Sequence, residues 1–474
     1  MNFYTDSSEW KWHFKNAIDW DSIIPLYYPT FPTKEGHKNI EEVKQFLEEL
    51  LEAVGDWTAN KVAPRARTLD EVGGGKVRDG GIESSKPLLE LYEDAKSLEL
   101  FGLTAPAEYG GLDTPVVVSL FGTCLLSRAC IASSSQLAFY SSIIDMLHRF
   151  CSKELQEKYI PEIIAGNISG SMCLTEPSSG SDVGSLRTSA TKQSNGTFLL
   201  NGTKCFITNG GGGLAFTLAR IKGAPEGLTG ISLFFVEENI VDAKTKQKKK
   251  NYIVAKNEHK LGMCGSPTCE IVYENTVATL VGEENKGMEY MFHLMNESRV
   301  GVGLQAIGGM EATLSYGREY VENRKQFGKP VSELPLMKRN LQDYETERDA
   351  FRALIADSCS YYDIYQRLDL KKRTTGDLTE AELKLFKNAK KWTRRRTPIL
   401  KYYGAETFTL ISQRGIQMLG GYGFMMEYDA QRFHRDSFGP LLYEGTLQIQ
   451  ALMAMKDLIK FIFTKPTKFL KDFI

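Results

Sequence analysis

The chain has 474 residues, 42% of them hydrophobic and 25% charged, as is ordinary for a soluble globular protein. A formal net charge of -1 gives no whole-chain field that would attract nucleic acid or acidic lipid. A chain of this length exceeds one hydrophobic core, so we expect two to three structural units.

The eight cysteines form no C-x-x-C pair, and histidines such as His148, His259 and His293 show no ligand spacing. These patterns argue against a metal site and a disulfide framework and favour a reducing compartment. The N-terminal residues lack a basic region followed by a long apolar stretch. We therefore expect no signal peptide, no membrane span and a cytoplasmic location.

The N-terminal third of the chain is predicted to be helical. Residues 1–38 are rich in aromatics and proline without a clear period, and they are interpreted as an irregular extension. From Glu41 onward apolar residues follow one helical stripe. Gly73–Gly75 marks a break. We expect a helical domain over 39–168, with further helices near 86–100, 115–150 and 152–165.

Near Gly170 the pattern changes to short β-rich runs such as Cys205–Thr208 and Ile231–Val236. Turn residues bound these runs, as at Asn201-Gly202 and Gly210–Gly213. The segment holds too little helix for βαβ units. It predicts a small antiparallel barrel or sandwich, assigned to a β-domain over 169–284.

Long helical patterns return from Gly287 and define a C-terminal helical domain over 285–474. The expected spans are 287–324, 333–366, 379–419 and 446–463. Lys371–Arg373 and Gly376 suggest an exposed loop between two of these helices.

Five short segments carry residues suited to chemistry. Thr175–Gly184 combines small hydroxyl residues with glycines, which leave backbone N–H groups open to phosphate or a polar ring edge. By itself this segment could equally be a plain solvent loop. Four further segments follow it in order: Asn201–Gly210, Arg324–Gly328, Gln417–Gly423 and Tyr443–Thr446.

The ordered set resembles the acyl-CoA dehydrogenase family over roughly residues 80–460, with cues that favour its methylthiopropionyl-CoA dehydrogenase-like branch. The resemblance implies an α+β fold: a helical N-terminal domain, a middle antiparallel β-barrel domain and a C-terminal four-helix bundle. It also implies FAD between the β-domain and the bundle.

The resemblance further implies roles for single residues at the flavin. Leu174, Thr175 and Phe206 would lie at its ring, and Thr208 would donate its hydroxyl to N5. Ser181 would lie near the pyrophosphate or the ligand. The remaining residues expected at the cofactor are Arg324, Gln326, Phe327, Gln417, Gly421, Thr446 and Gln448.

Glu444 is the expected catalytic base. It follows the apolar run Leu441–Tyr443 and precedes Gly445, a context that suits a carboxylate directed into a pocket. By the family mechanism, Glu444 removes the α-proton of an acyl-CoA thioester while a hydride passes from Cβ to flavin N5, leaving a trans-2-enoyl-CoA. Arg299, Tyr443 and Gly445, with Ser181, would contact the substrate.

Some relatives carry the base immediately before the arginine that corresponds to Arg299. That position is Ser298 here, and Glu297 is turned about 100° away around the helix. We therefore reject Glu297 as the base.

The expected partners are the acyl-CoA and an electron-transfer flavoprotein, within a homodimer or homotetramer that shares FAD sites through Arg324, Gln326 and Phe327. Two alternatives stay open: an acyl-CoA oxidase that uses oxygen, and a flavin-containing DNA-binding relative. The second draws on the basic run from Lys384 to Arg396. A solvated helix face explains that run better, so no nucleic acid is expected.

Overall fold

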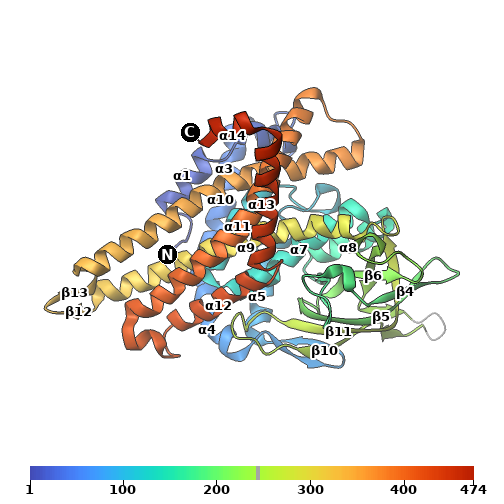
Figure 1. The fold of residues 1–474 in the computed structure, drawn as a ribbon, viewed down its shortest axis with the longest axis horizontal. Coiled ribbons are helices and arrows are strands. Elements are labelled where there is room, and N and C mark those ends of the chain that lie inside the picture. The colour runs from blue at the N-terminus through green and yellow to red at the C-terminus, as the bar shows by residue number, and fades with distance from the viewer. Residues whose placement is uncertain (242–245, 474) are drawn as a thin grey trace. The chain divides into compact units, whose positions relative to one another are not determined.

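The structure is a computed structural model, which describes residues 1–241 and 246–473. The chain divides into two compact units, and neither unit is continuous in sequence. Unit one contains residues 1–56, 115–128 and 298–474; unit two contains residues 57–114 and 129–297. Each unit is described by itself below (Figure 1).

Unit two is built around a closed β-barrel (Figure 1). Its strands are β3 (Ser169–Cys173), β4 (Ser189–Lys192), β5 (Phe198–Thr208), β6 (Gly213–Ile221), β7 (Ile231–Glu237), β10 (Ile253–Asn257) and β11 (Thr268–Val281). Strand β6 pairs with β4, β4 with β5, β5 with β11, β11 with β7, and β7 with β6, which closes the ring.

The barrel confirms the expected middle domain, and most of its pairings are antiparallel. The two exceptions are β3–β6 and β4–β6, which are parallel. Side chains that alternate inward along the strands fill the interior. Among the fully or almost fully buried ones are Phe198, Leu200, Phe234, Tyr252 and Ile271.

Strand β5 corrects one sequence-based expectation. Asn201-Gly202 was predicted to be a turn, yet β5 runs through it without interruption. Gly202 is required there for space, because a Cβ atom would lie 2.4 Å from the Thr188 hydroxyl. The pairing of β5 with β11 shifts register opposite this point, between Tyr273 and Thr276. A glycine that is needed in a strand for close backbone approach can therefore be mistaken for a turn residue in the sequence.

Helices and small hairpins complete unit two. The helices are α4 (Ala63–Val72), α5 (Lys86–Ser97), α7 (Ile131–Phe150) and α8 (Lys153–Ile164), with a π-helical turn at Thr58–Val62. The hairpins are β1 (Gly75–Arg78) with β2 (Gly81–Ser84), and β8 (Asn239–Val241) with β9 (Lys248–Lys250).

Long helices form the C-terminal part of the chain. They are α9 (Gly287–Asn323), α10 (Pro335–Thr375), α11 (Glu380–Leu419), α12 (Ala430–Leu442), α13 (Leu447–Thr464) and α14 (Pro466–Phe473). Helices α10 and α11 run side by side (Figure 1). Thr379 and Glu382 form a capping box that begins α11. The expected spans are confirmed for α9, α11 and α13, whereas α10 extends nine residues beyond its prediction. Lys371–Arg373, expected in a loop, therefore lie in the last turns of α10, and only Gly376 ends the helix.

The N-terminal extension is a second correction, because residues 1–38 contain two helices, α1 (Ser8–Asn16) and α2 (Trp20–Tyr27). Side chains of Ser7 and Asp19 cap their first turns. Each helix is too short to show a clear apolar period. Both depend on burial of aromatic side chains such as Trp10, Phe14 and Trp20.

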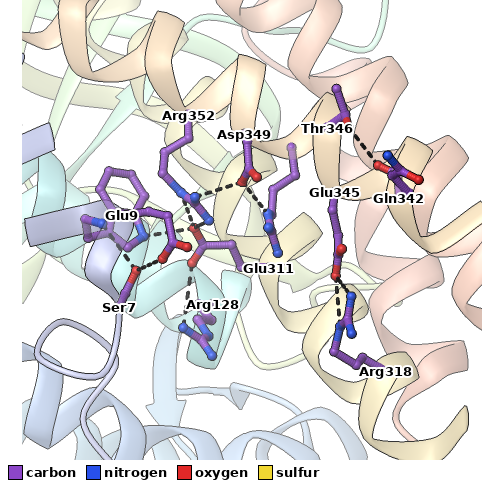
Figure 2. A network of polar contacts seen from close by, with 12 residues as sticks. Ser7, Glu9, Arg128, Glu311, Arg318, Gln342, Glu345, Thr346, Asp349 and Arg352 are labelled. Carbon is purple, nitrogen blue, oxygen red and sulfur yellow. Dashed lines mark hydrogen bonds and ion pairs between the residues drawn. The ribbon is translucent and has the colours of Figure 1, made fainter. Parts of the chain in front are cut away.

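A polar network in unit one includes the buried Glu311 and Arg352 (Figure 2), and Trp10 joins it. Its indole Nε1 donates to Glu311 of α9 over 2.8 Å. Arg352 of α10 donates to the same carboxylate oxygen over 2.8 Å, and Arg128 lies 3.8 Å from the other oxygen. Arg128 belongs to α6 (Val116–Ala129). With α3 (Ile40–Trp57), these elements complete the N-terminal part of unit one.

Candidate active site

Glu444 lies in a tight turn between two helices of unit one. Helix α12 ends at Leu442, and α13 begins at Leu447 after the cap residue Thr446. Glu444 has φ 57° and Gly445 has φ 86°, so both adopt the left-handed conformation. Few side chains tolerate this region. At Gly445 a Cβ atom would also lie 2.7 Å from the Gln450 amide nitrogen, so glycine is needed for conformation and for space.

Side chains of α9 and α13 hold the turn. Arg299 of α9 donates from Nε to the Glu444 carbonyl over 3.1 Å, and Gln450 of α13 donates to the same oxygen over 3.1 Å. The Tyr443 hydroxyl donates to Gln305 of α9 over 2.7 Å. The strained backbone of Glu444 is thereby fixed by neighbours distant in sequence, a pattern that is typical of functional sites.

The Glu444 carboxyl is in a state suited to proton transfer. Its Oε2 atom is buried and has no hydrogen-bond partner. Burial raises the pKa of Glu444 to about 7, and the positive charges of Arg299 and Lys401 oppose that rise. Among the described residues, the backbone N–H of Glu444 also has no partner. The turn therefore offers one carboxylate oxygen and one backbone donor.

Lys401 is a site residue that sequence reasoning missed. It lies on the buried stripe of α11 and donates from Nζ to the Leu441 carbonyl, near the end of α12, over 3.2 Å. Burial lowers its pKa to about 8, Glu444 opposes that lowering, and Arg299 adds to it. The sequence did offer one signal for Lys401. It is a charged residue on the apolar stripe that contains Leu400, Gly404 and Ala405, which indicates a buried charge.

In unit two, the structure brings together four residues expected at the flavin ring. The Thr175 carbonyl accepts from the Cys205 backbone N–H over 3.0 Å, so the loop that contains Leu174 and Thr175 lies along β5. The next residue of β5, Phe206, is 64% exposed at φ 59°. Thr208, half-buried, follows two positions later on the same strand. An exposed aromatic ring held in a strained backbone is typical of a ligand-binding surface.

A buried ion pair anchors this loop. Lys204 and Glu176 are 2.8 Å apart, with exposed side-chain fractions of 0% and 3%. Lys204 also donates to the Leu174 carbonyl, and Glu176 accepts from the backbone N–H groups of Arg187 and Thr188. The sequence contained both charges within its motifs, but nothing in their spacing indicated that they pair.

Ser181 lies on the exposed surface of the same loop. Next to it, Gly180 has open space where a Cβ atom would be. The loop segment between Ser179 and Ser185 is organised by its own hydroxyls, because both serines donate to the Asp182 carbonyl. Ser181 is thus placed on an ordered loop.

The hairpin expected to reach a partner's cofactor is exposed. Strands β12 (Lys325–Gln326) and β13 (Lys329–Pro330) directly follow α9, with Phe327 and Gly328 at the turn. Phe327 is 90% exposed at φ 51°. Among the described residues, the Arg324 guanidinium makes no hydrogen bond or ion pair.

The remaining cofactor candidates lie on unit one. Gln417 is exposed in the last turn of α11 and accepts from Arg414. Gly421 lies in the 3-10 turn Gly420–Phe424, where a Cβ atom would meet nothing within 4 Å. Thr446 is half-buried and Gln448 exposed, both directly after the Glu444 turn.

Glu297, rejected above as the base, is itself a half-buried acid of unit two. It accepts from the Ser142 hydroxyl over 2.9 Å, and burial together with the Asp145 carboxylate raises its pKa to about 7. Asp145 in turn is held by Arg149 and His293. A pKa near neutrality therefore does not distinguish Glu297 from Glu444, and its exclusion rests on helix position alone.

The arginines at the end of the basic run of α11 contact neighbouring helices of unit one, whereas its lysines are exposed. Arg394 pairs with Asp457 of α13, and Arg396 pairs with Asp357 of α10. Arg395 lies over the Phe461 ring. These contacts join the arginine half of the run to helices α10 and α13.

No helix in the described part of the chain combines the length and apolar character needed to cross a membrane.

Three family models match the sequence. They are "Acyl-CoA dehydrogenase, N-terminal domain" over residues 45–167, the middle domain over 171–276 and the C-terminal domain over 285–459.

Individual proteins show the same similarity. An acyl-CoA dehydrogenase of Bacillus subtilis (strain 168) is 33% identical over 398 residues, 81% of this chain and 96% of the relative. A 3-methylmercaptopropionyl-CoA dehydrogenase of Ruegeria pomeroyi is 30% identical over 416 residues, 85% of this chain and 68% of that protein. The structure of butyryl-CoA dehydrogenase from Megasphaera elsdenii superposes with a TM-score of 0.72 at 27% identity, covering 87% and 98% of the two chains.

Proposed function

We propose, since the chain belongs to the acyl-CoA dehydrogenase family of oxidoreductases, that it introduces a trans double bond between Cα and Cβ of an acyl-CoA thioester with Glu444 as the base. The observation that carries the proposal is the Glu444 turn. A buried carboxylate oxygen without a partner and an unpaired backbone N–H lie on one residue, which is held in a strained conformation.

The proposed proton transfer uses both groups of Glu444. The carboxylate takes the α-proton, and its raised pKa brings its proton affinity close to the working pH. The backbone N–H donates to the thioester oxygen and stabilises the negative charge that develops there. An apolar acyl chain that covers the carboxylate would exclude water and raise its pKa further.

FAD is the cofactor of this family and, when bound, supplies the acceptor for the hydride that leaves Cβ. The residues present fit such a group. In unit two, Phe206 offers an exposed ring face, and Thr208 offers a hydroxyl on the same strand beside Leu174 and Thr175. Ser181 lies on a loop open to a phosphate, and the further contacts proposed for FAD are those of Thr446 and Gln448.

We further propose that Arg324, Gln326 and Phe327 contact the FAD of a partner subunit, together with Gln417 and Gly421. The support is the exposed hairpin. The Arg324 guanidinium that precedes it has no partner among the described residues, and its Phe327 ring is almost fully exposed. A guanidinium can donate to two phosphate oxygens at once. The substrate contacts proposed are those of Arg299, Tyr443, Gly445 and Ser181.

The electron acceptor proposed for the reduced enzyme is an electron-transfer flavoprotein, as for dehydrogenases of the family. An acyl-CoA oxidase would deliver its electrons to oxygen instead. Rapid mixing of the substrate-reduced protein with air-saturated buffer distinguishes the two. We expect slow reoxidation in air and fast reoxidation by an electron-transfer flavoprotein.

The experiment that tests the function is a panel of acyl-CoA thioesters added anaerobically to the purified protein. We expect yellow protein whose flavin absorbance bleaches with at least one thioester, and the bleaching pattern identifies the acyl group. Colourless protein that takes up no FAD on reconstitution, or FAD-loaded protein that no acyl-CoA bleaches, would overturn the proposal.

A further inference from the structure

We propose that Lys401 is a positioning residue for Glu444: it holds the Leu441 carbonyl at the end of α12 and supplies a buried positive charge that keeps the carboxylate ionised. The inference rests on the proposed role of Glu444 as the base. It adds a residue that none of the sequence motifs contains.

The location of Lys401 argues that its charge has a use. Its exposed fraction is 0%, although lysine is almost never fully buried unless it is paired. Among the described residues, its ammonium makes one hydrogen bond, to the Leu441 carbonyl. Desolvating an ammonium group is costly. A methionine would fill similar space in α11 without that cost, so packing alone does not explain a lysine.

The Leu441 carbonyl is the second part of the argument. It lies three residues before Glu444, near the C-terminal end of α12, where helix carbonyls lack an intrahelical partner. The Lys401 ammonium satisfies this carbonyl and carries a positive charge at the negative end of the helix dipole. With Arg299 and Gln450 at the Glu444 carbonyl, the turn is fixed before and after the base.

The ionisable groups around Glu444 come from three helices. Arg299 of α9 and Lys401 of α11 both favour its ionised form. Tyr443 adds no charge, because burial, Glu444 and Asp436 of α12 raise its pKa well above the ordinary value. Gln450 of α13 is neutral. Arg299 also donates to the Glu444 carbonyl. Lys401 is the second cation that opposes the effect of burial on the Glu444 pKa.

The test compares three substitutions of Lys401 in the FAD-loaded protein. Lys401→Gln retains a hydrogen-bond donor without the charge, Lys401→Met removes both, and Lys401→Arg retains the charge. Flavin reduction by an accepted acyl-CoA is measured in single turnovers between pH 5.5 and 9. Lys387→Met removes an exposed charge from the same helix and serves as the control.

In the plot of reduction rate against pH, the rate falls on the acid side with an apparent pKa. We expect Lys401→Gln and Lys401→Met to raise that pKa by about one unit, because an opposite charge near the carboxylate is lost. Well below that pKa the reduction rate falls about tenfold, and it recovers at alkaline pH. Lys401→Met should also lower the alkaline plateau, because the Leu441 contact is lost. Lys401→Arg should stay closer to the wild type, and Lys387→Met should be unchanged.

A second readout does not depend on turnover. The thermal midpoint is measured against pH for Lys401→Gln and for the Lys401→Gln/Glu444→Gln double variant. The difference in thermal midpoint between these two variants depends on the ionisation of Glu444 alone. The pH at which this difference is half complete should be higher than for the matching pair of wild type and Glu444→Gln.

Unchanged acid limbs and stability midpoints in folded Lys401→Gln would overturn the role of Lys401, as would an equal loss of rate at every pH. If Lys401→Met does not fold, Lys401→Gln and Lys401→Arg decide. Failure of the proposed function looks different: no acyl-CoA bleaches the wild type, while the stability readout still reports whether Lys401 and Glu444 are coupled.

Discussion

Three non-glycine residues that the sequence assigned to the site have a left-handed backbone: Phe206, Phe327 and Glu444. Such a conformation costs on the order of 1–3 kcal/mol per residue and persists only where the surroundings enforce it. At Glu444 the surroundings are the two donors on its carbonyl. This turn therefore presents both an unpartnered carboxylate oxygen and an unpartnered backbone N–H, the two groups that the proposed proton transfer uses.

The base assignment leads to a direct prediction for Glu444→Gln. The amide keeps the shape and the backbone N–H but cannot accept the α-proton. We expect flavin reduction to slow by about 10²–10⁴-fold, the usual contribution of a positioned base, while acyl-CoA binding survives. Glu297→Gln is the matched control, because Glu297 is a second half-buried acid with a pKa of about 7. Near-normal turnover in Glu444→Gln combined with loss in Glu297→Gln would reverse the assignment.

The raised pKa of Glu444 also makes stability depend on pH. The ordinary value of 4.5 applies to the unfolded chain, and the folded value is about 7. Between these values the folded state binds more protons, so this group lowers stability as pH rises from about 4.5 through 7. Relative to the wild type, Glu444→Gln should gain at most about 3 kcal/mol above pH 7 and little below pH 4.5. Thermal midpoints at pH 5 and pH 8 measure the difference, and an equal shift at both would contradict it.

At the scale of elements, a loop and a strand share the proposed flavin surface of unit two. The Thr175 carbonyl accepts a hydrogen bond from Cys205 of β5, and the buried ion pair between Glu176 and Lys204 anchors the loop to the same strand. Neither charge is exposed to solvent, so each depends on the other. The loop is therefore held by an interaction that is expensive to break.

Removal of one partner of this pair should disturb the loop and the cofactor together. We expect Lys204→Met to cost about 3–5 kcal/mol, because Glu176 would remain buried and uncompensated. FAD affinity should fall as well. The Glu176→Gln/Lys204→Met double variant should recover part of the loss. Neutralising the exposed Lys192–Glu284 pair of the same unit should cost less than about 1 kcal/mol. Equal thermal shifts for both pairs would refute this account.

The β12–β13 hairpin yields the prediction for assembly. Under the proposed shared site, Arg324→Ala should lower FAD affinity and dimer stability together, because cofactor binding is linked to assembly. Lys325→Ala, in the same exposed hairpin, is the control and should leave both near the wild type. Sedimentation with and without added FAD measures the effect. A monomer that still holds FAD tightly would rule the shared site out.

At the scale of the whole molecule, the chain carries a segment outside the matched family models, which begin at residue 45. This segment contains helices α1 and α2, and residues of and next to α2 form hydrogen bonds with α10. The Asp19 backbone donates to Ser360, the Tyr27 hydroxyl to Asp363, and Arg367 to the Leu26 carbonyl. With Trp10 bonded to Glu311, the extension forms part of the packed core of unit one.

This attachment predicts different effects for two neighbouring tryptophans. Trp10→Phe removes the donor to the buried Glu311 carboxylate and should destabilise the protein by about 1.5–3 kcal/mol, as for a hydrogen bond to a charged group. Trp12→Phe alters a side chain that is 58% exposed and should have little effect. The urea midpoints of both variants measure this. Equal midpoints would show that the Trp10 contact contributes nothing.

Much of this protein follows from its sequence alone. Periodic apolar stripes predicted α3, α9, α11 and α13, because a long amphipathic helix repeats its signal over several turns. Alternating short runs between turn residues predicted a β-domain. The ordered motifs identified the family and placed Glu444, Thr208 and Arg324 on their segments. These signals are local, so a linear reading suffices to detect them.

The tertiary structure decided what depends on residues that are distant in sequence. Helices α1 and α2 are too short for a periodic signal and gain their stability from burial against other elements. Asn201-Gly202 imitates a turn, and only the approach of Thr188 explains its glycine. The partners of Lys204 and Lys401 lie 28 and 40 residues away, at Glu176 and Leu441. The energy of a buried charge depends on what the fold places around it, and no spacing along the chain encodes that environment.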